Sequence, residues 1–293
     1  MGQRQHLWRT PHAHDARPCP RHPEKRRLCG APLSVSGLVT LLGSNIGVLG
    51  HVRPAEKHNE KERTPVKVFS SPAVKKALDE VIIMFRQETG VSIDAVFEPT
   101  GQLLRRIDAG ESFDVMIAVT ESFGPLTTVI EPHTLTSVAR AGIGVAVKRG
   151  TPEPDISTAE SFIQTLRAAR SVAYSGVGAS GAYFMTLLDK LGLSEDVGAR
   201  ATVVEKGYVA QALITGNADV AIQQLSELLF VPQAQVVGPF PPELQHYTEF
   251  SAAVSAQASD PDQAQAFVNF LTSAPAQTAY IQTRLELPTA PAQ

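Results

Sequence analysis

The chain has 293 residues, of which 43% are hydrophobic and 19% are charged, so it suits a globular protein large enough for two lobes. Residues 1–65 hold 11 Lys and Arg against 5 Asp and Glu, whereas residues 66–293 hold 15 against 24. The acidic body offers no basic surface for nucleic acid. Cys19, Cys29 and six of the eight histidines precede residue 66, so we expect no disulfide, no bound metal and no cofactor in the body.

The first 65 residues are predicted to be a disordered leader that contains an export signal. Residues 1–27 are rich in Arg, His and Pro and show no apolar periodicity. Lys25, Arg26 and Arg27 then precede a mildly apolar stretch from Leu33 to Gly50, which is the order of an export signal. The alternative is a leader without a targeting role. Export would place the mature protein in the periplasm.

From Val66 onward, short apolar runs alternate with segments of helical periodicity, a pattern typical of an α/β fold. We expect the first three strands at 66–69, 91–97 and 113–119, with helices after the first two. A longer strand is expected at 138–148. The Pro-rich segment that begins at Gly150 breaks regular structure, and the capping box of Ser157 and Glu160 predicts a helix start.

The second half repeats the alternation, with strands expected at 171–174, 201–204 and 219–223 and helices at 183–191 and 208–214. Residues 247–256 form an extended segment long enough to return to the first lobe. Asp260 and Pro261 mark the start of another helix, and 274–285 is the last. We therefore predict two lobes, each a mainly parallel sheet flanked by helices, joined by two hinge crossings. Lobe I is 66–148 plus 248–293, and lobe II is 149–247.

Small hydroxyl-bearing residues occupy three strand-to-helix junctions of this body. They are Ser70 and Ser71, then Thr100 with Gly101 and Gln102, then Ser180 with Ala179 and Gly181. Free N–H groups and the positive dipole at a helix start attract anions. Ligands of open α/β sheets bind at the carboxyl ends of the strands, where all three junctions fall. The sequence thus predicts a site for a small anion; the alternative for each hydroxyl is a simple helix cap.

Several segments resemble the periplasmic molybdate-binding proteins of ABC importers, which have the type II periplasmic binding protein fold. The resemblance covers residues 66–288 and is carried by the Ser70–Ser71 junction, by Phe97 through Gly110, by Gly178 through Gly181, and by Gly216 through Ile222. It implies a monomeric binding protein that closes on an oxyanion such as molybdate or tungstate and delivers it to a membrane permease. The ligand residues that it implies are Ser70, Ser71, Thr100, Gly101, Gln102, Ala179, Ser180, Gly181, Tyr208, Val209 and Gln224.

Pro72, Pro99 and Gln224 depart from the family pattern. At the position of Gln224, the family often has Tyr. These departures leave a carboxylate or another oxyanion open as the ligand. An alternative is an isomerase of aconitate-like tricarboxylates that uses the same cleft, with Glu98 or Glu205 moving a proton. A regulatory effector domain would need a DNA-binding segment, and residues 1–65 show no helix-turn-helix pattern.

Overall fold

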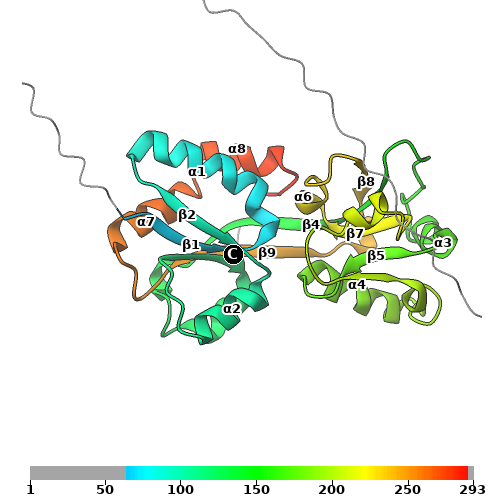
Figure 1. The fold of residues 1–293 in the computed structure, drawn as a ribbon, viewed down its shortest axis with the longest axis horizontal. Helices are drawn as coiled ribbons and strands as arrows, with labels where there is room; N and C mark the ends of the chain where they lie inside the picture. Colours follow the sequence, from blue (N-terminus) through cyan, green and yellow to red (C-terminus); the bar gives the residue numbers. More distant parts are fainter. Residues whose placement is uncertain (1–63, 290–293) are drawn as a thin grey trace, which may run out of the picture. The chain divides into compact units, whose positions relative to one another are not determined.

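The computed structural model describes residues 64–289, so the predicted leader and export signal lie outside the described residues up to position 63. All the described residues belong to one compact unit. Within the described range, one continuous sheet has the strand order β2-β1-β3-β9-β4-β7-β5-β6, and β8 also pairs with β4 (Figure 1). The strands are β1 (Val66–Ser70), β2 (Ile93–Phe97), β3 (Val115–Val119), β4 (Thr136–Lys148), β5 (Val172–Ser175), β6 (Thr202–Val204), β7 (Val220–Gln224), β8 (Ala234–Pro239) and β9 (Tyr247–Val254).

Helices connect these strands in the alternation that the sequence predicts. The α-helices are α1 (Lys75–Thr89), α2 (Thr100–Asp108), α3 (Ala159–Ala168), α4 (Ala179–Lys190), α5 (Gln211–Ile214), α6 (Leu225–Leu228), α7 (Pro261–Phe270) and α8 (Ala274–Gln282). Short 3-10 helices are η1 (Pro72–Val74), η2 (Thr120–Leu126), η3 (Pro132–Thr134), η4 (Gly198–Arg200) and η5 (Pro242–Leu244). The helix predicted at 208–214 is shorter, because α5 begins only at Gln211.

The capping box of α3 lies one residue later than predicted. Thr158, not Ser157, is the N-cap: its hydroxyl accepts from the N–H of Ser161, and the Ser161 hydroxyl accepts from the N–H of Thr158. Ser157 is held in the preceding loop, where the Asp155 carboxylate accepts from its N–H at 2.9 Å and from its hydroxyl at 2.7 Å. Because the Asp155 carboxylate binds Ser157, the N-cap of α3 is Thr158 and not Ser157.

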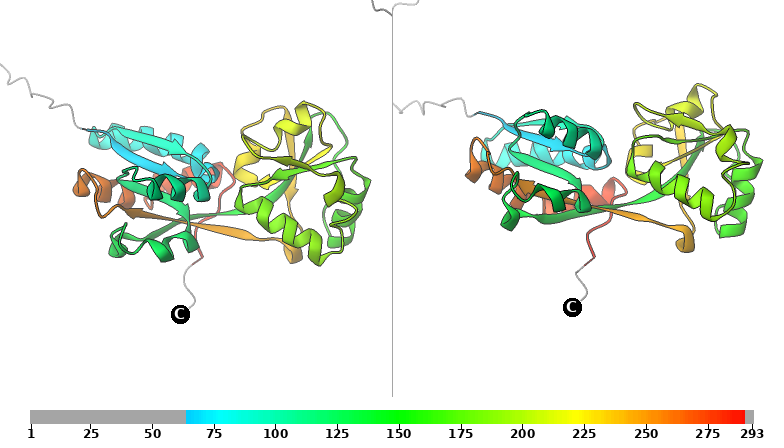
Figure 2. Two further views of the ribbon diagram at one scale, coloured as in Figure 1. Left: turned by 60° about the horizontal axis from the view of Figure 1, so that its bottom comes forward. Right: turned by 90° about the horizontal axis from the view of Figure 1, so that it is seen from below.

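Two long strands, β4 and β9, join the lobes (Figure 2). Strands β1, β2 and β3 are parallel to one another, and β9 runs antiparallel to β3. Strand β4 pairs with β9 from Thr136 to Gly142, and then with β7 and β8 from Ile143 onward. The first change of sheet partners thus lies inside a strand, before the predicted boundary at residue 149. A strand can continue through such a crossing because its two halves hydrogen-bond to different neighbours.

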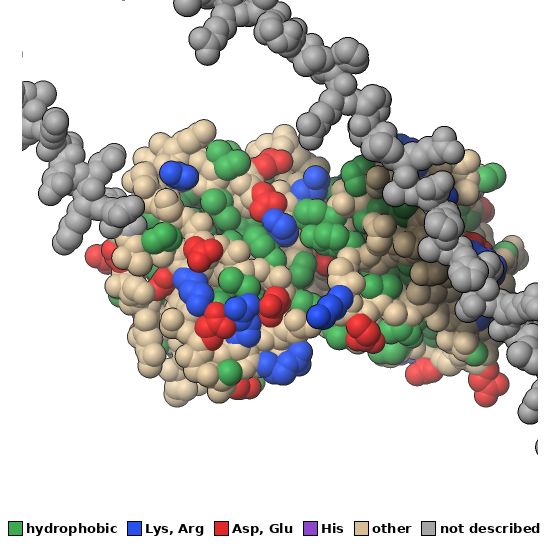
Figure 3. Space-filling model, viewed as in Figure 1, with side chains coloured by type: hydrophobic (Ala, Val, Ile, Leu, Met, Phe, Trp, Pro, Cys, Tyr) green, Lys and Arg blue, Asp and Glu red, His purple; other side chains and the backbone are tan. Residues whose placement is uncertain are grey.

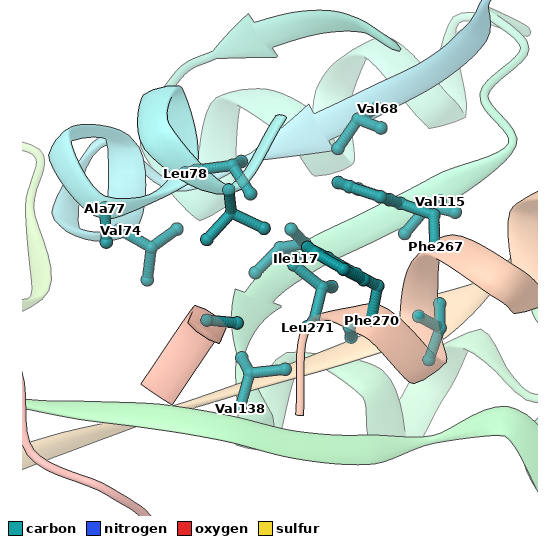
Figure 4. Close-up of a cluster of buried hydrophobic side chains, with 14 of the residues drawn as sticks. Val68, Val74, Ala77, Leu78, Val115, Ile117, Val138, Phe267, Phe270 and Leu271 are labelled. Atoms are coloured by element: carbon teal, nitrogen blue, oxygen red, sulfur yellow. The ribbon is translucent and has the colours of Figure 1, made fainter. Parts of the chain in front are cut away.

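Separate hydrophobic cores support the two ends of this sheet. In the first lobe, α1 and α7 pack on the sheet, and Phe267 and Phe270 lie among the buried side chains of this core (Figure 4). Phe85 contacts both rings, with ring centroids 5.0 and 5.4 Å apart. In the second lobe, Phe162 and Phe240 pack with centroids 4.6 Å apart. Each lobe has its own buried core, so each can hold its part of a site rigidly.

Asp114 ties three segments of the first lobe together. Its carboxylate accepts from the N–H of Lys67 at 2.7 Å and from the N–H of Ser259 at 2.6 Å, and the side chain is buried. These bonds fix the start of β1 and the approach to α7. A separate ion pair lies where β4 and β9 cross between the lobes. Arg140 pairs with Glu286 at 2.7 Å, and its guanidinium lies over the ring of Tyr247.

Candidate functional site

A cleft of about 740 Å³ is lined by the carboxyl ends of strands from both lobes. Lobe I contributes the β1–η1 junction, the β2–α2 junction and the end of β3, and lobe II contributes the β5–α4 junction, the loop before α5 and the β7–α6 junction. Its volume lies within the range of pockets that bind small organic molecules. Predicted residues that line it are Ser71, Thr100, Gly101, Gln102, Ala179, Ser180, Tyr208 and Gln224.

The first junction uses its backbone donors within the protein. The N–H of Ser71 donates to the carbonyl of Ile117 at 2.8 Å, and the Ser71 hydroxyl accepts from the N–H of Ala73 at 3.4 Å as an N-cap. Pro72 has no N–H. This junction can therefore offer a ligand the hydroxyl proton of Ser71 but no free N–H group.

The start of α2 is open to a ligand. Its N-cap is Pro99, which makes no side-chain cap bond, and the N–H groups of Thr100 and Gly101 have no acceptor in the helix. The Thr100 hydroxyl accepts from the N–H of Val119 at 3.3 Å, which orients the hydroxyl proton. Thr100 and Gly101, which carry these two N–H groups and the hydroxyl, both line the cleft from lobe I.

The start of α4 supplies the corresponding donors from lobe II. Gly178 is the N-cap without a side-chain bond, so the N–H groups of the first turn, beginning at Ala179, have no helical acceptor. Ser180 is 2% exposed, lines the cleft and makes no side-chain hydrogen bond within residues 64–289. The Ser175 hydroxyl fixes the preceding turn by accepting from the N–H of Gly178 at 2.9 Å.

Two neighbouring glutamines at the end of β7 have different roles. Gln223 is 3% exposed, and its carbonyl oxygen accepts from the N–H of Val209 at 2.9 Å, so it holds the loop before α5. Gln224 is 4% exposed and lines the cleft, and its amide makes no hydrogen bond to the residues that the structure describes. A buried amide without a partner in the protein is a ready contact for a polar ligand.

Three of the predicted residues do not reach the cleft. Ser70 is fully buried, and its hydroxyl donates to the carbonyl of Ser71. Val209, one of the ligand residues that the resemblance implies, does not line the cleft, and its N–H donates to the side-chain oxygen of Gln223. Gly181 lies beneath the cleft wall, where it lets α4 approach the backbone of Ser175 more closely than a side chain would allow.

Carboxyl groups also line the cleft, and they differ in their surroundings. Glu98 pairs with Arg106 at 3.0 Å, and Arg106 also pairs with Glu111. Figure 3 shows that Lys or Arg and Asp or Glu side chains lie close together on one face of lobe I. Glu205 also lines the cleft, and its carboxyl group lies against Gly176, where a side chain at position 176 would contact it. Both predicted glutamates are thus at the cleft, but Glu98 is held by a cation.

Sequence reasoning missed Glu227, which lines the cleft from α6. Burial raises the pKa of Glu227 to about 7, and a hydrogen bond from Gln223 opposes this rise. The residue is partly exposed, which leaves it accessible from the cleft. A carboxyl group in this environment exchanges its proton near neutral pH.

Two lysines line the cleft. The anion site predicted from the sequence is formed by neutral donors and does not include them. Lys75 pairs with Asp79 at 2.8 Å and lies 4.3 Å from the ring centroid of Phe97. Lys206 is exposed at the other side. These two lysines can add positive charge near the neutral donors of α2 and α4, since the exposed pair of Lys75 with Asp79 is weak.

Neither a membrane span nor a metal centre is found in the part of the chain that the structure describes. None of its helices combines the length and apolar character needed to cross a membrane. It contains no group of three or more His, Cys, Asp or Glu side chains placed to hold a metal ion.

Known proteins resemble the chain in both sequence and structure. Residues 66–283 match the family described as bacterial extracellular solute-binding protein. The chain is 32% identical over 218 residues to an aconitate isomerase from a Pseudomonas species, covering 72% of this chain and 83% of that protein.

Solved structures share the fold at lower identity. The periplasmic molybdate-binding protein of Azotobacter vinelandii matches with a TM-score of 0.65 and 17% identity, over 76% of this chain and 100% of that one. The sulfate-binding protein SubI of Mycobacterium tuberculosis matches with a TM-score of 0.61 and 16% identity, over 76% of this chain and 86% of that one. These likenesses confirm the predicted two-lobed periplasmic binding protein fold. Because the family model matches residues 66–283 and the fold is that of periplasmic binding proteins, the chain belongs to the bacterial extracellular solute-binding protein family.

Proposed function

We propose that this protein is the exported solute-binding component of an ABC importer and captures a small oxyanion or carboxylate in the cleft. The observation that carries the proposal is the convergence of Ser71, Thr100 and Ser180 on one cleft, together with the open first turns of α2 and α4. Helix starts of this kind bind anions without a buried cation. Delivery to a membrane permease is proposed from the family.

Capture follows from the distribution of donors over two lobes. Ser71 and the start of α2 belong to lobe I, whereas the start of α4 and Gln224 belong to lobe II. An anion that contacts both sets stabilises the closed arrangement by its differential affinity for that state. Closure also removes water from the donors, which strengthens each hydrogen bond to a charged ligand.

Calorimetry with molybdate, tungstate, sulfate, citrate and trans-aconitate tests this proposal. We expect at least one of these anions to bind, and Ser71→Ala, Thr100→Ala or Ser180→Ala to weaken its binding by about 1–3 kcal/mol each, since each removes a donor to a charge. Thr278→Ala, which removes an exposed hydroxyl on α8, is the matched control. Unchanged affinity in all three cleft variants would refute the proposed binding site.

A second candidate is an isomerase of aconitate-like tricarboxylates. Two observations favour it: the 32% identity to an aconitate isomerase, and a cleft carboxyl, Glu227, whose pKa lies at about 7. A base of this pKa suits proton transfer at neutral pH. It would remove a proton from the CH₂ carbon beside the double bond, leaving an allylic anion. Return of that proton to the other end of the three-carbon unit moves the double bond and converts one isomer into the other.

Incubation with cis- or trans-aconitate in D₂O, followed by proton NMR, tests this candidate. An isomerase yields the other isomer, and a base that exchanges with solvent adds deuterium at the carbon that receives the proton. We expect Glu227→Gln to abolish conversion and Glu98→Gln to reduce it less, because Glu98 is held by Arg106. Tight binding of trans-aconitate without conversion would reject the isomerase and leave the binding protein.

A further inference from the structure

Glu227 occupies a position in the cleft that the anion-binding proposal does not use. It lies on α6 in lobe II, and α6 packs beside η1, which follows Ser71 in lobe I. Its carboxyl group therefore lies near the place where the two lobes meet around a ligand. Unlike Glu98, it forms no ion pair with a Lys, Arg or His side chain of residues 64–289.

Polar and ionisable groups from several elements surround Glu227. From β7, Gln223 uses its carbonyl oxygen to accept from Val209, and its side chain opposes the rise in the Glu227 pKa that burial causes. The phenol of Tyr208, from the loop before α5, stacks on Phe230 and has its pKa raised by burial and by Glu227. The other ionisable residues that line the cleft are Lys75, Glu98, Glu205 and Lys206. On α1, Asp79 acts on the Tyr208 phenol and Lys76 lies over the Phe230 ring.

An anion that enters this cleft brings negative charge toward Glu227. An ionised carboxylate would repel it, whereas a protonated carboxyl can donate a hydrogen bond to one of its oxygens. We propose that Glu227 meets the bound anion as a carboxylic acid and donates a hydrogen bond to it, so that the protein takes up a proton with each anion that it captures. The inference rests on the proposed binding of an anion in the cleft and not on the isomerase candidate, in which Glu227 must be ionised in the complex to act as a base.

This arrangement makes Glu227 a determinant of affinity as well as a contact. Burial already holds the pKa of Glu227 at about 7 without a ligand, and a bound negative charge raises it further. Above neutral pH the free protein must therefore gain a proton on binding, and its affinity must fall with rising pH by about tenfold per pH unit. Below pH 6 the carboxyl is already protonated and the dependence should vanish.

Calorimetry of tungstate and trans-aconitate at pH 8, in Tris and in HEPES, measures the protons taken up. The difference in buffer ionisation enthalpy should reveal about 0.9 proton per ligand for the wild type, given a pKa near 7. Glu227→Gln keeps a hydrogen-bond donor but cannot titrate, so it should lose this uptake. Its affinity should also change little between pH 7 and pH 9.

Glu80→Gln provides the matched control, because Glu80 is exposed on α1 and does not line the cleft. It should show the wild-type uptake. Protons that belong to the ligand itself appear equally in the wild type and in Glu227→Gln, and so cancel in the comparison. Binding with equal uptake in both proteins would overturn the role of Glu227 and leave the binding function standing. Failure of every anion of the panel to bind would overturn both.

Discussion

Gly181→Ala tests whether the close approach of α4 to β5 positions the anion site. A Cβ at position 181 would overlap the carbonyl oxygen of Ser175 and lie 2.7 Å from its carbonyl carbon. An ordinary contact needs at least 3.4 Å, so helix and strand must separate by more than 0.7 Å. Overpacking of this kind costs about 1–3 kcal/mol of stability, which for a domain of this size lowers Tm by about 2–4 °C per kcal/mol.

The same shift should weaken ligand binding. The first-turn N–H groups of α4 move with the helix, and a hydrogen bond lengthened by more than 0.7 Å from about 2.9 Å leaves the effective range. We expect Gly181→Ala to reduce anion affinity by about 1–3 kcal/mol, or roughly 5- to 150-fold, although residue 181 itself does not line the cleft. Urea unfolding and calorimetry with the best anion of the panel measure the two effects.

Gly198→Ala is the control for this substitution, because its Cβ would meet only the Leu188 side chain at 3.9 Å. It should stay within about 0.5 kcal/mol of the wild type. If Gly181→Ala matches Gly198→Ala in both stability and affinity, the start of α4 is not held by its contact with β5. The proposed geometry of the site would then be wrong.

Three further predictions concern carboxylates. Asp114→Ala should destabilise the protein by about 2–4 kcal/mol in urea unfolding, because the N–H groups of Lys67 and Ser259 lose their acceptor; near-wild-type stability would contradict this. Arg106 and Lys67 lower the pKa of Glu111 to about 2, below the unfolded value of 4.5. The ionised Glu111 therefore stabilises the folded protein above pH 4.5, and this stabilisation is lost as the pH falls toward 2. Glu111→Gln should flatten the stability profile in that window, and parallel profiles would exclude this role. Burial raises the folded pKa of Glu227 above its unfolded value, so wild-type stability should fall as pH rises from about 4.5 through 7. Glu227→Gln should lack this fall, and an identical pH profile would show that the carboxyl is not desolvated.

The positions of the three junctions were predictable because each depends on local signals. A short apolar run followed by a hydroxyl or glycine and then a helical period locates a strand end, and the parallel strands bring such ends to one edge. Ser71, Thr100 and Ser180 do line one cleft. The crossing inside β4 was not predicted, although Gly142 and Gly144 flank Ile143, where β4 exchanges β9 for β7, and glycine inside a strand often marks a bend or a close backbone approach.

Single-residue errors at these junctions have a common physical cause. Successive side chains of a strand point to opposite faces, so the end of a strand must be known to one residue before the exposed hydroxyl can be chosen. Ser70 is the last residue of β1 and is buried, whereas Ser71 opens to the cleft. The α3 cap shifted by one position for a different reason, since the Asp155 carboxylate accepts from the N–H and hydroxyl of Ser157.

Glu227 was missed although the sequence contains a signal for it. The run from Leu225 to Val231 is apolar except for Ser226 and Glu227, and a lone carboxyl in an apolar run must reach solvent, a partner or a cavity. Residues three apart in a helix lie on the same face, so a helix that begins after Gln224 carries Glu227 to the same side as that amide. Both residues line the cleft. A ligand residue predicted at a strand end therefore implies a second candidate one helical turn later. At this junction, that second position holds the group that can exchange a proton.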